Sequence, residues 1–77
     1  MKLNSNKVPQ PYDFTVPELD KFRELCNFSV DELWYFNLRA KHKSNTYIAL
    51  EMSVSEAQVS KLARRVKDKM IRIVPYL

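Results

Sequence analysis

The chain has 77 residues, of which 45% are hydrophobic, and a net charge of +4. A chain this short supports one hydrophobic core, and without any glycine it is poorly suited to tight β-hairpins, so the composition disfavours a sheet protein and predicts one all-α domain. One cysteine excludes an intrachain disulfide and a cysteine zinc cluster, and no apolar stretch approaches the ~20 residues of a membrane-spanning helix, so we expect a cytoplasmic protein.

Residues 1–14 are predicted to form an extended or mobile N-terminal arm, ahead of a single domain over residues 15–77. The run MKLNSNKVPQPYD has no hydrophobic periodicity, and Pro9 and Pro11 oppose a helix.

The first helix is predicted from Thr15 to about Cys26. Thr15 is placed as its N-cap and Glu18 completes a capping box, while Phe14 can pack on Leu19 as a hydrophobic staple. Helical spacing predicts that one stripe of this helix is buried. The stripe consists of Leu19, Phe22, Leu25 and Cys26.

A second helix is predicted over residues 30–41 by the same signals, with Ser29 as the cap and Glu32 completing the box. It carries more apolar side chains than one stripe can hold. One side contains Val30, Leu33, Phe36, Asn37 and Ala40. Trp34, Tyr35 and Leu38 lie on neighbouring faces, where they either pack against the first helix or form a patch for another protein.

Two further helices follow closely. Ser44 is a cap for a segment of about two turns that ends at Met52. Ser55 then caps a helix over residues 55–70, with Gln58 at the capping-box position and Val54 placed to pack on Val59. The sequence therefore predicts a compact bundle of about four helices.

The last two helices have the spacing of a helix-turn-helix, which needs apolar side chains at fixed positions and a small residue where the helices cross. Counted from Asn45, the apolar positions hold Ile48, Met52, Val54, Val59 and Leu62, and the small residue is Ala49. Ser53 occupies the turn position that usually holds glycine, at a cost of about 1 kcal/mol if the residue is left-handed.

Residues 28–49 resemble the stretch shared by LuxR-type DNA-binding domains and region four of bacterial sigma factors. The matching positions are Phe28, Ser29, Ala40, Lys41, Ser44, Asn45, Ile48 and Ala49. The chain departs from the pattern at Val30, where proline is usual, and at His42, where a linker glycine is usual. No glycine-broken helix follows residue 70, which makes the sigma-type likeness the better one. The resemblance covers roughly residues 28–70 and implies a trihelical DNA-binding domain.

The predicted DNA-reading residues lie on the fourth helix, whose residues 55–77 hold the entire charge excess. The candidates for base contact are Ser55, Glu56, Ala57, Ser60, Lys61 and Arg64. The candidates for phosphate contact are Lys43, Ser44, Asn45, Thr46, Tyr47, Arg65, Lys67 and Lys69. Asn45 and Thr46 serve equally well as plain capping residues, and Gln58 is as well explained by capping as by adenine contact.

The remaining features favour binding over catalysis. The sequence shows no nucleophile with a base, no paired acids and no phosphate loop, so we expect neither an enzyme nor a cofactor or metal site. His42, the only histidine, is best explained as a cation at a helix C-terminus. Val59, Leu62, Val66 and Ile73 keep a heptad-like spacing that either covers the first helix or forms a homodimer.

The expected function is sequence-specific binding of double-stranded DNA by a small transcriptional regulator. The alternative is a protein-interaction module of the same fold that docks on RNA polymerase or another transcription or replication machine without reading bases, through the aromatic second helix or the N-terminal arm. The compact size suits a phage or mobile-element protein.

Overall fold

The structure, a computed structural model, describes residues 10–77, and all of its regular elements in that range are helical. The α-helices are α1 (Val16–Leu25), α2 (Val30–Ala40), α3 (Asn45–Met52) and α4 (Glu56–Ile73). Short 3₁₀ turns, η1 (Pro11–Asp13) and η2 (Val74–Tyr76), lie near the two ends. The prediction of an all-α bundle of about four helices is confirmed.

Each α-helix begins at a hydroxyl cap that the sequence identifies. The side chains of Thr15, Ser29, Ser44 and Ser55 accept hydrogen bonds from backbone N–H groups three residues on. Glu18 and Glu32 return the bond to the cap N–H at 2.8 Å and 2.9 Å, so two capping boxes are closed. The third predicted box is wrong in part, because the Gln58 side chain makes no such bond; a neutral amide is a weaker acceptor than a carboxylate.

Three residues in the left-handed region take the place of glycine near the ends of the first three helices. They are Asn27 (φ 53°), His42 (φ 63°) and Ser53 (φ 58°). Ser53 ends α3, where its N–H and that of Val54 bond back to carbonyls of the last turn of α3. The turn between α3 and α4 is therefore formed without glycine, and Ser53 carries the steric cost of its Cβ.

We expect Ser53→Gly to stabilise the protein by about 1 kcal/mol, because glycine adopts this conformation without a Cβ clash. Urea unfolding followed by circular dichroism measures the change. Ser60→Gly is the matched control, since Ser60 lies exposed within α4, and there the same substitution should destabilise by about 0.5 kcal/mol. Loss of stability in both variants would contradict a left-handed Ser53.

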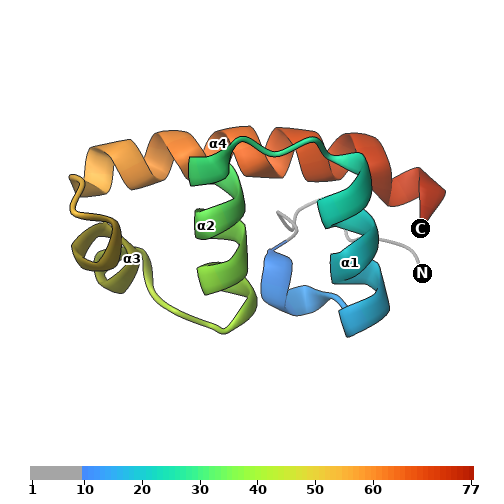
Figure 1. The fold of residues 1–77 in the computed structure, drawn as a ribbon, viewed down its shortest axis with the longest axis horizontal. Helices are drawn as coiled ribbons and strands as arrows, with labels where there is room; N and C mark the ends of the chain where they lie inside the picture. The colour runs from blue at the N-terminus through green and yellow to red at the C-terminus, as the bar shows by residue number, and fades with distance from the viewer. Residues whose placement is uncertain (1–9) are drawn as a thin grey trace.

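The long helix α4 runs along the molecule and packs against α3, α2 and α1 (Figure 1). Its inward side consists of Val59, Leu62, Val66 and Met70, all buried. The α3 side chains Ile48, Ala49 and Met52 are buried as well, and Val54 packs against the same core. Each position that the sequence assigned to helix-turn-helix packing thus contributes to the core.

The orientation of α2 differs from the prediction. Tyr35 is buried and Glu32 is only 5% exposed, whereas Val30 is 83% exposed and Leu33 lies at the surface. The side of α2 that carries Glu32 and Tyr35 is inward, and Lys69 of α4 binds Glu32 there. Trp34 is 42% exposed, so it is not a core residue. Leu25, predicted in the buried stripe of α1, is also exposed.

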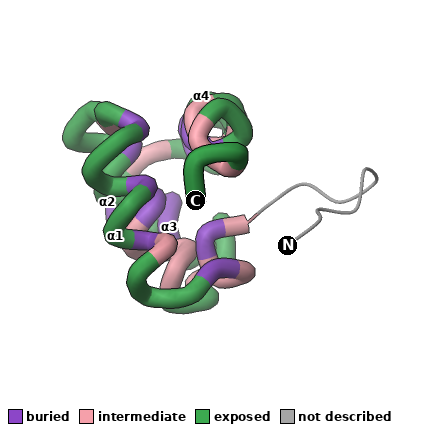
Figure 2. The backbone as a smooth tube through the Cα atoms, turned by 90° about the vertical axis from the view of Figure 1, so that its right-hand side faces the viewer, coloured by how far each residue is buried: buried purple, intermediate pink, exposed green. Residues whose placement is uncertain are grey.

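The segment Gln10–Phe14 is packed against the helices, so the predicted arm extends too far toward the C-terminus. Pro11 and Phe14 are buried, and the tube of Figure 2 has buried stretches in this segment as it has in the helices. The Phe14 ring meets Phe22 edge-on at 4.8 Å, and Tyr12 stacks on His42 at 4.3 Å. The rest of the predicted arm, residues 1–9, lies outside the described residues.

Candidate nucleic-acid interface

All of the predicted base-contact residues lie exposed at the start or along the outward side of α4. These are Ser55, Glu56, Ala57, Ser60, Lys61 and Arg64. Helical spacing places Ala57, Lys61 and Arg64 opposite the buried side chains of the same helix. A helix with a free polar side of this kind fits the major groove of DNA, where arginine and lysine can donate to guanine.

The first turns of α3 and α4 are held together by a hydrogen bond. Thr46 Oγ1 donates to Glu56 Oε1 at 3.4 Å. Glu56 also lies in the first turn of α4, where the helix dipole favours a negative charge. This contact fixes the corner that α3 and α4 would present to a ligand, and it gives Glu56 and Thr46 a structural role beside the predicted contacts.

The phosphate candidates around the start of α3 are exposed except for Lys43, which is half-buried. Ser44 Oγ accepts from the Tyr47 N–H at 3.1 Å, so the hydroxyl serves as the cap. The Lys43 ammonium lies 5.0 Å from the centre of the Tyr47 ring. Asn45 and Thr46 are exposed beside them, so this end of α3 keeps polar groups accessible to an anion.

Lys69, which was predicted to contact phosphate, is held by two groups of the protein itself. Its ammonium binds Glu32 Oε1 at 2.5 Å and donates to the Asn27 carbonyl at 3.0 Å. Burial raises the pKa of the Glu32 carboxyl, but the hydrogen bonds from Lys69 and Ser29 and the charge of Lys69 together leave that pKa lowered. Lys69 is therefore a structural link between α2 and α4. Arg65 remains exposed and Lys67 is half-buried.

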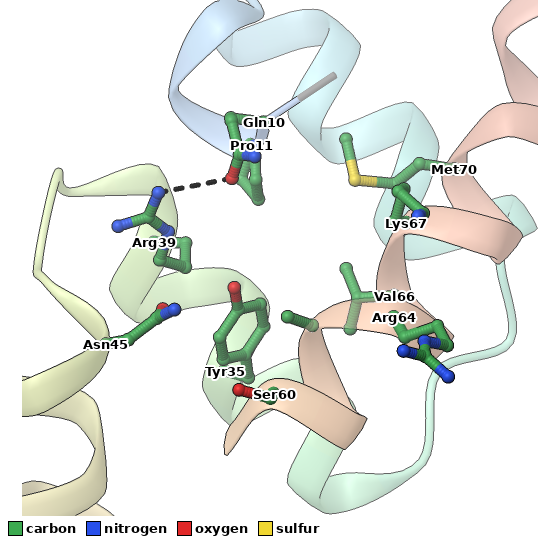
Figure 3. Close-up of a pocket in the computed structure, with 11 residues that line it drawn as sticks. Gln10, Pro11, Tyr35, Arg39, Asn45, Ser60, Arg64, Val66, Lys67 and Met70 are labelled. Carbon is green, nitrogen blue, oxygen red and sulfur yellow. Dashed lines mark hydrogen bonds between the residues drawn. The ribbon is translucent and has the colours of Figure 1, made fainter. Parts of the chain in front are cut away.

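A groove of about 310 Å³ lies between the segment at Gln10, α2, the start of α3 and α4 (Figure 3). Four of the predicted DNA-contact residues line it, namely Asn45, Ser60, Arg64 and Lys67. Arg39 and Tyr35 of α2 line it as well, and sequence reasoning missed both. In the sequence, Arg39 is a basic residue near the end of an aromatic helix. A solvated cation is also favoured there, so this position alone does not indicate a site.

Arg39 is held in place from several sides. Its Nη1 donates to the Lys43 carbonyl at 2.7 Å and its Nη2 donates to Gln10 Oε1 at 3.2 Å. The guanidinium also lies 5.0 Å from the centre of the Tyr12 ring. Its Nε is buried and has no hydrogen-bond partner among the described residues. Burial raises the pKa of Tyr35 and outweighs both the charge of Arg39 and its hydrogen bond to the phenol, so Tyr35 keeps its proton at neutral pH.

Other reactive groups lie away from this face. Burial raises the pKa of Cys26 to about 11 although Lys69 opposes the shift, so the thiol is protonated at neutral pH. Within residues 10–77, no three His, Cys, Asp or Glu side chains gather as a metal ion would require. None of the described helices has the length and apolar character needed to cross a membrane.

The likeness of residues 28–49 to sigma-factor and LuxR-type domains stays a prediction from the sequence motifs. The geometry adds a buried crossing of α3 and α4 and an exposed polar side of α4, which together define the candidate interface. Comparison of the chain with protein-family models, curated proteins and solved structures finds no match.

Proposed function

We propose that this protein binds double-stranded DNA sequence-specifically, with the outward side of α4 in the major groove. The observation that carries the proposal is the pairing of a buried α3–α4 crossing with an α4 face on which Ser60, Lys61 and Arg64 are exposed together. A second helix packed in this way and free on its outward side is the arrangement by which helix-turn-helix proteins reach base edges.

The distribution of charge also favours the outward side of α4 as the DNA-binding face. Residues 55–77 hold six basic and two acidic side chains, and Lys69 is the only one of the six that is held by a described carboxylate. Lys61, Arg64, Arg65 and Arg72 are exposed along α4. A helix with this charge is attracted to the phosphate backbone before any base is read. The role proposed for such binding is that of a small transcriptional regulator.

The test is selection of binding sites from a random duplex library, followed by affinity measurements across salt concentrations. We expect affinity to fall steeply with salt and Arg64→Ala to cost about 1–3 kcal/mol while relaxing preference at one base pair. Lys21→Ala is the matched control, because Lys21 is exposed on α1, at the end of the molecule away from α3 (Figure 1). Binding that resists high salt, or that Lys21→Ala weakens as much as Arg64→Ala, would contradict the proposal.

An exposed apolar face on α2 favours a second function, docking on another protein such as RNA polymerase. Val30, Leu33 and Trp34 share this face at helical spacing, and each is at least 36% exposed. Under this alternative, Trp34→Ala abolishes capture of the partner while Arg64→Ala leaves it intact. Light scattering in the same experiment reports whether the protein is the homodimer that paired half-sites would require.

A further inference from the structure

The groove beside α4 combines a concentration of positive charge with polar donors. Arg39, Arg64 and Lys67 line it, together with the phenol of Tyr35 and the side chains of Asn45 and Ser60. None of its lining residues is an aspartate or glutamate. Cations that share one cavity without an acid repel one another, and a bound anion removes that repulsion.

Arg39 supplies a donor that is already in position. Its two terminal nitrogens are occupied by Lys43 and Gln10, so the guanidinium cannot turn freely. The Nε donor is buried and has no hydrogen-bond partner among the described residues. A buried donor without an acceptor is destabilising, and an acceptor that arrives with a ligand restores the lost hydrogen bond. A charged donor favours an anionic oxygen in particular.

We propose that this groove is an oxyanion site that binds a phosphate group. Arg39 Nε donates to one phosphate oxygen from the α2 side, and Lys67 and Arg64 neutralise the charge from the α4 side. The phenol of Tyr35 and the amide of Asn45 are directed into the gap between these elements (Figure 3), where each can donate a further hydrogen bond. The volume of about 310 Å³ exceeds that of a phosphate alone, so the site also admits part of the molecule that carries it.

Two sources can supply the phosphate. Asn45, Ser60, Arg64 and Lys67 belong both to the groove and to the predicted DNA contacts, so the first source is the backbone of a DNA duplex lying along α4. The second source is a small phosphorylated molecule. The DNA source rests on the proposed function, whereas the oxyanion site itself does not.

The site is tested by titrating the full chain with inorganic phosphate at constant ionic strength, with two-dimensional ¹⁵N NMR as the readout. We expect saturable shifts at the Arg39 Nε–H and the Asn45 amide. Loss of a charge-assisted hydrogen bond or a cation should weaken phosphate binding roughly tenfold or more in Arg39→Gln and in Lys67→Gln. Lys21→Gln is the matched control, because Lys21 is exposed on α1 and does not line the groove.

Lys67→Gln keeps the test decisive if Arg39→Gln fails to fold, since no described hydrogen bond or ion pair involves Lys67. Shifts that never saturate, or an equal loss of binding in Lys21→Gln, would overturn the oxyanion site.

The second part of the experiment adds the selected DNA duplex to the phosphate-bound protein. Displacement of phosphate, together with weaker DNA binding by Arg39→Gln, supports the DNA backbone as the source. DNA that binds while phosphate stays bound overturns that source and supports a small phosphorylated ligand. If phosphate binds saturably and no DNA binds, the proposed function is rejected and the oxyanion site is supported. If DNA binds and inorganic phosphate causes no saturable shifts, only the oxyanion site is rejected.

Discussion

Lys69→Met should destabilise the protein by about 2–3 kcal/mol, because it leaves the Glu32 carboxylate buried without its cation. Glu32 is 5% exposed, and its only described ion-pair partner is Lys69. The expected loss is smaller than for a fully buried pair, since the Lys69 side chain is 30% exposed and the Ser29 N–H still donates to Glu32. Urea unfolding at pH 7 measures the change.

A double-mutant cycle separates this charge effect from the loss of packing. Adding Glu32→Gln to Lys69→Met removes the stranded charge and keeps an acceptor for Ser29, so the double variant should recover most of the lost stability. Lys61→Met is the control for removing an exposed lysine from α4, and it should change the stability by less than about 0.5 kcal/mol. Equal losses in the two lysine variants would mean that the ion pair contributes nothing.

The same pair gives the stability a defined pH dependence. The pKa of Glu32 is lowered in the folded protein from an ordinary value of 4.5. Its contribution to stability is therefore complete above pH 4.5 and is lost as the pH falls through the folded pKa. The difference in unfolding free energy between the parent and Lys69→Met should be largest near neutral pH and should shrink below pH 4.5.

The sequence predicted the helices well because their signals are local. Thr15, Ser29, Ser44 and Ser55 each act on backbone groups within three residues, so a short window contains the information that starts each helix. The α3–α4 packing was also predictable, since Ile48, Met52 and Val59 stand at the apolar positions that a helix-turn-helix requires, and all three are buried.

The errors arise where contacts join distant parts of the chain. Glu32 and Lys69 are 37 residues apart, so nothing local indicates that Lys69 pairs with Glu32. The same contact lies on the side of α2 that faces α4, where Tyr35 is buried, whereas Leu33 is exposed. Arg39 was missed for a related reason, because its partner Gln10 lies 29 residues away in a segment predicted to be an arm.

Phe14→Ala should destabilise the protein by about 3 kcal/mol, because Phe14 packs the segment Gln10–Phe14 against the helices. Phe14 is 9% exposed, and its ring lies edge-on to Phe22, which in turn meets Phe36 of α2 at 6.1 Å. Removing the ring therefore leaves a cavity at the end of an aromatic cluster that joins the N-terminal segment to α1 and α2. Urea unfolding followed by circular dichroism measures the loss.

Two further variants test whether residues 10–14 are packed into the core or form a loose arm. Phe14→Leu keeps most of the apolar volume and should lose less than half as much stability as Phe14→Ala. Val16→Ala removes an apolar side chain two residues later, but Val16 is 69% exposed, so its effect should stay within about 0.5 kcal/mol. If Phe14→Ala were as mild as Val16→Ala, residues 10–14 would be the loose arm that the prolines suggest. A large loss confined to Phe14 instead makes this segment part of the core, and it explains how Gln10 can hold Arg39 at the groove beside α4.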